Sequence, residues 1–193
     1  MFEYISGKIT ETTPTYIVVE AGTIGYFINI SLQTHSKISG KEHYKVYIHQ
    51  IIREDTNALY GFADKSEREI FRLLISVSGI GANTARVMLS SLSANEVKKA
   101  IRTDDVATFQ NIKGIGAKTA QRVIIDLKDK INKAEIDDET GLAFTSSIPE
   151  EALSALSMLG FPKIKAEKAV KKIYGSNSNI SVEELVKNAL KIL

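Results

Sequence analysis

The chain carries nearly the same stretch twice: Ser78-Gly79-Ile80-Gly81-Ala82-Asn83-Thr84-Ala85 and Lys113-Gly114-Ile115-Gly116-Ala117-Lys118-Thr119-Ala120. The two copies agree at six of eight aligned positions and lie 35 residues apart. Apolar residues at helical spacing precede and follow each copy. The repeat therefore predicts a helix, a tight glycine turn and a second helix, in two copies.

The glycines of these turns suit an anion-binding site. Glycine adopts positive φ readily and lets a ligand approach the main chain closely. The helix that follows begins with unpaired N–H groups at the positive end of its dipole, and a nucleic-acid phosphate is the expected anion. The candidate phosphate-binding residues are Gly79, Gly81, Asn83, Thr84, Gly114, Gly116, Lys118 and Thr119. Lys118 adds a charge that Asn83 lacks, so we expect the second hairpin to hold phosphate more strongly.

The repeat has two other interpretations. Glycines that serve only helix packing are common, although a second copy with the same Thr-Ala continuation argues against that alternative. Gly116-Ala117-Lys118-Thr119 also ends somewhat like a P-loop. However, Ile112 stands at the place of the first P-loop glycine, and the preceding pattern is helical rather than that of a strand. A P-loop is therefore not predicted.

Composition excludes several classes of site. The 193 residues include no cysteine, which rules out disulfides and thiolate metal sites, and the three histidines have no metal-ligand spacing. We therefore expect neither a cofactor nor a metal. The start Met1-Phe2-Glu3-Tyr4-Ile5 has no signal-peptide pattern, and no apolar run of membrane-spanning length occurs. A cytoplasmic location without membrane contact is expected.

The net charge of +2 says little by itself, but the charges are unevenly distributed. Residues 64–132 contain 12 Lys and Arg against 8 Asp and Glu, whereas residues 133–148 contain 1 against 4. The basic excess is thus greatest in the segment with the glycine turns. Such a modest excess suits binding through main-chain N–H groups and a few cations better than binding through a broad basic patch.

Residues 1–63 have the pattern of an all-β domain. Short runs of β-branched and aromatic residues alternate with turn residues such as Gly7 and Pro14. The predicted strand segments are Phe2-Tyr4, Lys8-Thr10, Tyr16-Ala21, Ile24-Ile30, Lys45-Ile52 and Ala58-Phe62. They favour a small five-stranded barrel of the OB-fold kind, with an SH3-like or other small barrel as the alternative. Arg53-Glu54-Asp55-Thr56 is interpreted as an acidic turn between two strands.

Residues 64–132 predict an all-α domain that holds both hairpins. Asp64 or Ser66 is a candidate N-cap, Ser93 with Glu96 forms a capping-box pattern, and Asp104-Asp105 precedes a further helix. The expected core positions are Leu74, Val77, Val87, Leu89, Ile101, Phe109, Val123 and Leu127. The overall fold class is thus α+β with several domains.

The remaining chain predicts a linker and a small helical domain. Residues 133–148 are acidic or small, with little apolar periodicity, and are interpreted as a flexible linker. Residues 149–193 predict a three-helix bundle, with Ser181 as a helix N-cap. About 45 residues bury little surface. The apolar residues of this bundle can therefore be interpreted either as a small core or as including an exposed patch that binds a partner.

With these parts in order, the chain resembles the RuvA family, which binds Holliday junctions for the bacterial branch-migration machine. The resemblance covers the whole length: the barrel start at 1–7, the segment 53–62, both Gly-Ile-Gly turns, Lys128-Asp129-Lys130, the acidic linker, and Leu159-Gly160-Phe161. Members often have a lysine where Asn83 stands. The first hairpin is therefore expected to bind phosphate more through main-chain N–H groups than through the side chain at position 83.

The resemblance implies a function in homologous recombination, DNA repair and the SOS response. Family members are not themselves enzymes; they form tetramers or octamers that hold a four-way junction open in square-planar form. Both hairpins would grip DNA phosphates, and Glu54 and Asp55 would form an acidic pin at the junction centre. The C-terminal domain would contact RuvB, the hexameric ATPase, with Leu156, Leu159 and Phe161 as candidate contacts. The RuvC resolvase is a further possible partner.

Two other function classes remain as alternatives. A nuclease would use Glu54, Asp55, Asp104 or Asp105 with a divalent ion, but two-metal hydrolysis needs carboxylates that converge on metals about 3.5–4 Å apart. These acids are adjacent in a turn or at a helix start, where turn formation and capping explain them. A protein-only adaptor would ignore DNA and use the C-terminal bundle alone.

Overall fold

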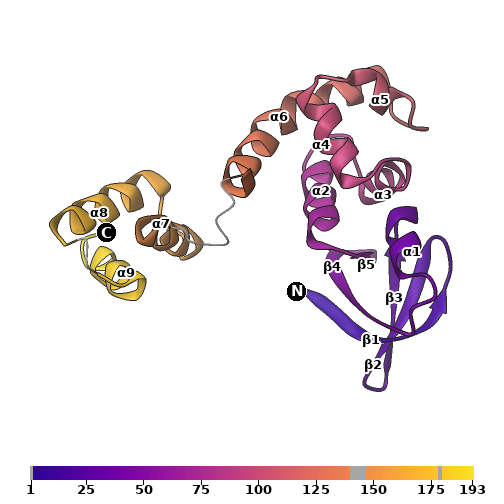
Figure 1. Ribbon diagram of the computed structural model, residues 1–193, viewed down its shortest axis with the longest axis horizontal. Helices are drawn as coiled ribbons and strands as arrows, with labels where there is room; N and C mark the ends of the chain where they lie inside the picture. Colours follow the sequence, from indigo (N-terminus) through magenta and orange to yellow (C-terminus); the bar gives the residue numbers. More distant parts are fainter. Residues whose placement is uncertain (1, 140–146, 178–179) are drawn as a thin grey trace. The chain divides into compact units, whose positions relative to one another are not determined.

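The computed structural model describes residues 2–139, 147–177 and 180–193. The chain divides into two compact units, Met1–Asp137 and Asp138–Leu193. The first holds the strands and the helices of both glycine hairpins, and the second holds a group of three helices (Figure 1). The predicted α+β class with separate β, hairpin and C-terminal helical parts is confirmed.

The β part of the first unit is a closed five-stranded barrel. Its strands are β1 (Tyr4–Thr12), β2 (Tyr16–Ala21), β3 (Ile24–Ile30), β4 (His43–Arg53) and β5 (Thr56–Phe62). They follow the order β1-β2-β3-β5-β4, with β1 also paired to β4 and with β3 parallel to β5. Alternate residues such as Ile17, Val19 and Ile28 point inward and are fully buried. The predicted OB-like barrel is therefore present.

One predicted turn in the barrel was wrong. Gly7 lies inside β1 rather than between two strands. A Cβ at this position would stand 2.0 Å from the carbonyl oxygen of Glu20. The same strand pairs with β4 from Tyr4 to Lys8 and with β2 from Lys8 onward. The glycine is needed because two backbones approach closely, not because the chain reverses.

A short helix, α1 (Leu32–Ile38), was missed by the sequence analysis. It lies between β3 and β4, and its N-cap Ser31 accepts a hydrogen bond from the Thr34 N–H. Ile38 anchors the helix in the barrel core.

The helical part of the first unit follows the prediction closely. Its helices are α2 (Lys65–Ile75), α3 (Ala82–Ser91), α4 (Ala94–Arg102), α5 (Val106–Gln110) and α6 (Ala117–Glu139). Asp64 caps α2, the Ser93–Glu96 capping box opens α4, and Asp105 caps α5. The predicted core residues are buried, except that Val87 is 42% exposed on α3.

The end of the helical segment differs from the prediction. We expected the helical pattern to stop near Asn132, but α6 continues to Glu139. Lys, Ala and Glu in this stretch are good helix formers, so an acidic composition alone did not mark a loop. Residues 140–146 of the predicted linker lie outside the described residues. Ile148, its last residue, already begins helix α7 (Ile148–Met158).

The barrel and the hairpin helices share one hydrophobic core. Tyr60 and Phe62 at the end of β5 join the helical cluster, where Phe71 of α2 contacts both rings. The ring centroids lie 5.2 Å apart for Tyr60 and Phe71 and 4.9 Å apart for Phe62 and Phe71. The predicted boundary at residue 63 thus separates β from α structure but not two compact units.

The second unit consists of α7, α8 (Lys163–Ser176) and α9 (Val182–Leu190), as predicted. Its small core is made of the buried residues Ala152, Leu156, Ala166, Ala169, Val170, Ile180, Leu185 and Ala189. Ser181 caps α9 through a bond from the Glu184 N–H. Within the described residues, none of the helices has the length and apolar character of a membrane span.

Candidate nucleic-acid interface

The two glycine turns have the same backbone geometry. Gly79 and Gly114 both have φ +92°, which L side chains rarely adopt. Ile80 and Ile115, each 5% exposed, anchor the turns in the helical core. In the first turn the Ile80 N–H donates to the Val77 carbonyl at 3.1 Å, and in the second the Ile115 N–H donates to the Ile112 carbonyl at 3.0 Å. The sequence repeat is therefore also a structural repeat.

The second glycine of each turn has no such conformational reason. Gly81 has φ −86° and ψ 170°, which any residue adopts, and Gly116 is not among the residues with positive φ. A Cβ built on either glycine meets nothing within 4 Å. The fold of the chain alone thus leaves room for a side chain here. A glycine at such a site is explained if a ligand must approach the backbone closely.

The helices that follow the turns lack the side-chain caps that begin five other helices; α8, which follows Pro162, also lacks one. Ser31, Asp64, Ser93, Asp105 and Ser181 each accept a backbone N–H at the start of a helix. Before α3 the N-cap is Gly81, which makes no side-chain bond. Gly116 takes the same place before α6, where its carbonyl accepts the Ala120 N–H at 2.9 Å. The first N–H groups of α3 and α6 are left for another acceptor.

The other predicted hairpin residues lie in the first turns of these helices. Asn83 and Lys118 are exposed, and Thr84 and Thr119 are half-buried. All four predicted side chains therefore stand beside the uncapped helix starts.

Two cations of α6 lie near the first turn, which the sequence did not predict. Arg122 of α6 donates from Nη1 to the carbonyl oxygen of Ser78 at 3.3 Å. Lys130 of the same helix donates from Nζ to Ser76 Oγ at 3.3 Å. Both contacts join positions more than forty residues apart, so helical spacing gave no signal for them.

The acidic turn lies where the sequence predicted it. Glu54 and Asp55 form the tip between β4 and β5, and both are exposed. Below the tip, Arg53 pairs with Thr56, and Gln50 Nε2 donates to Asn57 Oδ1 at 3.0 Å. The hairpin presents two adjacent carboxylates to solvent on a regular antiparallel ladder.

The structure does not support a two-metal site at the acids considered for a nuclease. Asp104 forms an ion pair with Lys128, and Asp105 accepts hydrogen bonds from the Thr108 N–H and hydroxyl. These hydrogen bonds lower the pKa of Asp105 below its usual value. In the described part of the chain, no three His, Cys, Asp or Glu residues gather in a way that could hold a metal ion.

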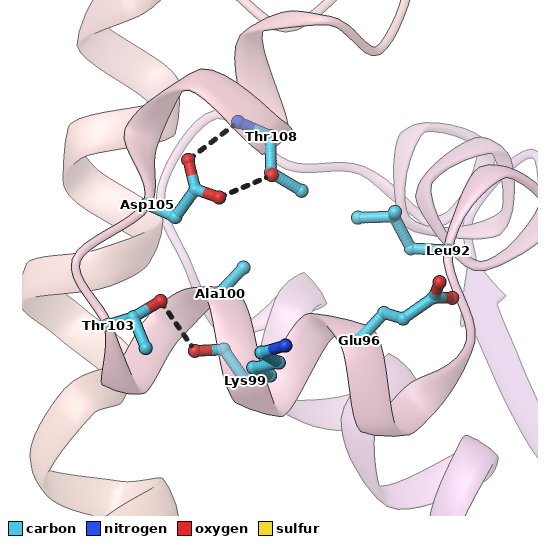
Figure 2. Close-up of a pocket in the computed structure, with 7 residues that line it drawn as sticks. All are labelled: Leu92, Glu96, Lys99, Ala100, Thr103, Asp105 and Thr108. Carbon is cyan, nitrogen blue, oxygen red and sulfur yellow. Dashed lines mark hydrogen bonds between the residues drawn. The ribbon is translucent and has the colours of Figure 1, made fainter.

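A hollow of about 210 Å³ lies between α4 and α5, and Figure 2 shows the seven residues that line it. Its polar groups serve their own helices: Asp105 bonds Thr108, and the Thr103 hydroxyl donates to the Lys99 carbonyl. Leu92 and Ala100 complete the wall. The hollow is therefore explained by helix capping and is not part of the candidate interface.

The three residues predicted to contact a partner protein from the C-terminal bundle differ in their exposure. Leu156 is fully buried in the bundle core, so a partner cannot reach it while the bundle is intact. Leu159 is 61% exposed and Phe161 is half-buried. Met158 and Ile164 beside them, 87% and 71% exposed, were not singled out from the sequence. Met158, Leu159, Phe161 and Ile164 lie close together in the sequence around the α7–α8 turn, and we refer to them as the apolar patch.

The barrel and the paired glycine turns define a tandem helix-hairpin-helix protein. Three family models match the chain: RuvA N terminal domain over residues 1–61, SAM-like helix-hairpin-helix tandem over residues 71–129, and RuvA C-terminal domain over residues 148–193. The chain belongs to the RuvA family.

Curated relatives agree with this assignment over their whole lengths. A protein of Christiangramia forsetii is 54% identical over 193 residues, and one of Flavobacterium psychrophilum is 49% identical over 193 residues. One of Bacteroides fragilis is 48% identical over 201 residues. Each alignment covers 100% of both chains, and each relative is called Holliday junction branch migration complex subunit RuvA.

Proposed function

We propose that this chain binds four-way DNA junctions as a subunit of a branch migration complex and is not itself the motor. Its relatives carry that name, and the chain matches them from end to end. Binding depends on junction shape and phosphate geometry, because the hairpins offer main-chain N–H groups rather than base-reading side chains. The ATPase that moves the DNA is a separate chain, RuvB. The cellular roles are homologous recombination and DNA repair.

One observation carries the proposal. Gly81 and Gly116 are glycines without positive φ and without steric crowding, and each stands before an uncapped helix start. A phosphate that approaches these helix starts explains both features at once. Asn83, Thr84, Lys118 and Thr119 are the side chains that complete the two phosphate sites.

The acidic tip supplies selectivity in this proposal. Glu54 and Asp55 repel phosphates of an ordinary duplex that would run across the tip. At an open junction the strands diverge, so the carboxylates sit at the crossover without meeting a continuous backbone. Attraction and repulsion are thus assigned to different parts of one compact unit.

A single copy of the chain has one pair of hairpins, whereas a four-way junction has four equivalent arms. We therefore propose a homotetramer on an open, square-planar junction, or an octamer with a tetramer on each face. We also propose the RuvC resolvase as an additional partner at the junction.

The second unit is proposed to recruit the RuvB motor through the apolar patch at the α7–α8 turn. Leu159 and Phe161 belong to the patch, and Met158 and Ile164 extend it. Leu156 supports the patch from the core rather than by direct contact. Exposed apolar residues that adjoin one another are typical of a protein-binding surface.

A gel-shift series with the full-length protein tests the proposed function. It compares a four-way junction with a linear duplex of the same length, over a range of salt concentrations and with Mg²⁺. We expect tight junction binding, weak duplex binding and no cleavage. The logarithm of affinity should fall by roughly 0.9 for each neutralised phosphate as the logarithm of salt rises. Equal affinity for the two DNAs, or cleavage of the junction, would contradict the proposal.

A further inference from the structure

The first hairpin lacks the two cations that the second has at Lys118 and Arg122. Its own cation, Arg86 of α3, donates to the Thr15 carbonyl and to Asn29 Oδ1 in the barrel. With the repeat offset of 35 residues, Asn83 corresponds to Lys118, and Val87 corresponds to Arg122. Val87 is exposed, so its helix position faces solvent as Arg122 does in the second copy. The two helix starts have the same geometry but very different side-chain charge.

Arg122 reaches across from the second hairpin to the first. Its Nη1 donates to the carbonyl oxygen of Ser78, the residue just before Gly79 in the first turn. The guanidinium has five N–H donors in a planar fork, and this bond uses one of them. The side chain remains exposed, so further donors are available to a ligand at the first turn.

We infer that Arg122 supplies the phosphate-binding cation of the first hairpin, in place of the lysine absent at Asn83. This inference rests on the proposed function. A guanidinium bonds phosphate oxygens bidentately and keeps its charge at all relevant pH values. The bond to Ser78 holds Arg122 in place before DNA arrives, which lowers the entropy cost of forming the contact.

Lys130 has a different explanation. It contacts Ser76, the C-cap of α2, where a cation interacts favourably with the negative end of the helix dipole. Ser78 lies beyond that helix end, in the turn itself. The competing explanation is that Arg122 only links α6 to the first turn and does not contact DNA. The experiment must distinguish this structural role from phosphate binding.

The experiment compares four proteins: wild type, Arg122→Gln, Asn83→Lys and the double variant. Junction affinity and its salt dependence are measured for each, together with the unfolding temperature. We expect Arg122→Gln to weaken junction binding about tenfold or more. Its salt slope should fall by about 0.9 for each bound copy of the chain.

The double variant is the decisive arm. If a lysine introduced at position 83 can serve the same phosphate as Arg122, Asn83→Lys raises affinity and salt slope much more in the Arg122→Gln background than in wild type. An equal gain in both backgrounds means independent sites and overturns the inference. Loss of thermal stability in Arg122→Gln without rescue by Asn83→Lys assigns Arg122 a structural role only, and also overturns it.

Lys99→Gln is the charge-matched control, because Lys99 lines the hollow between α4 and α5. A comparable loss of binding in this control would mean that the Arg122 effect comes from the lost net charge alone, and it would overturn the inference. Failure of the wild type to prefer the junction would overturn the proposed function instead. Normal binding by Arg122→Gln, with a normal wild type, would overturn only the role of Arg122.

Discussion

At the scale of single residues, the glycines of each turn serve two different needs. Gly79 and Gly114 adopt positive φ, so a side chain at either position would be strained. Gly81 and Gly116 adopt ordinary backbone angles with open space around them. The first pair is needed for folding, and we assign the second pair to the ligand.

This division predicts opposite effects on stability and binding. Serine is a better N-cap than glycine, so Gly81→Ser and Gly116→Ser should keep or slightly raise stability, by about a few tenths of a kcal/mol. The serine hydroxyl would occupy the N–H groups meant for phosphate, and junction affinity should fall. Urea unfolding and gel shift measure the two effects. Gly79→Ser is the matched control and should lose stability instead. Serine variants at 81 and 116 that bind normally would contradict the assignment.

At the scale of elements, the β4–β5 hairpin carries its two carboxylates at the tip, whereas its stability comes from the paired strands below. Its carboxylates are exposed at the tip, whereas the ladder below continues into the barrel. Changes at Glu54 and Asp55 should therefore alter DNA preference without altering the fold.

The combined variant Glu54→Gln with Asp55→Asn removes the two charges and keeps the side-chain size. Repulsion of duplex phosphates is then lost, so linear duplex should bind several-fold more tightly while the unfolding temperature stays the same. Competition of labelled junction with unlabelled duplex measures the change. Glu20→Gln with Glu42→Gln removes the same charge elsewhere on the barrel. If this control matches the tip variant, net charge rather than the tip sets selectivity.

Sequence patterns predicted those parts of the fold that depend on local chemistry. The hairpins, the capping box at Ser93 and the C-terminal helices were all found, because glycine turns, caps and apolar periodicity are encoded within a few residues. Two of the errors arose where distant residues meet. Gly7 is required by the carbonyl of Glu20, and Arg122 meets Ser78 only in the folded chain. No local spacing contains that information.

At the scale of the whole molecule, a buried polar cluster joins the barrel to α2. Glu67, only 2% exposed, accepts hydrogen bonds from the hydroxyls of Ser31 and Thr34, the latter at 2.8 Å. Thr34 Oγ1 in turn accepts the Ala63 N–H at 3.0 Å. Burial raises the pKa of Glu67 above its usual value, and the two hydroxyl bonds oppose that shift. The cluster links α1 and the end of β5 to the start of α2.

Thr34→Val tests this polar contact between the barrel and α2, because valine has almost the same shape as threonine. It removes a donor to a buried carboxylate and leaves the Ala63 N–H unpaired, so we expect a loss of about 2–4 kcal/mol when Glu67 is charged. Without the hydroxyl, the folded-state pKa of Glu67 rises further. The loss should therefore be smaller at pH values below the wild-type folded-state pKa, which lies above 4.5, and grow as pH rises through it. Urea unfolding at pH 4 and pH 8 measures both; a pH-independent difference would contradict the account.

The second unit is predicted to act on the motor without acting on DNA. Leu159→Ser changes an exposed side chain, so the bundle should stay folded and junction binding should stay normal. Stimulation of branch migration by RuvB should fall at least several-fold, because the apolar contact is lost. Leu156→Ser is the comparison: it buries an unpaired hydroxyl and should unfold the bundle. Full stimulation by Leu159→Ser would exclude it as a contact.

The bond between Arg122 and Ser78 also bears on how this duplicated motif can evolve and be engineered. Tandem copies are often treated as interchangeable modules, but here the second copy touches the turn of the first. A first hairpin transferred alone to another scaffold would lack Arg122, because that residue belongs to the second hairpin. A change in either copy is therefore expected to affect the other.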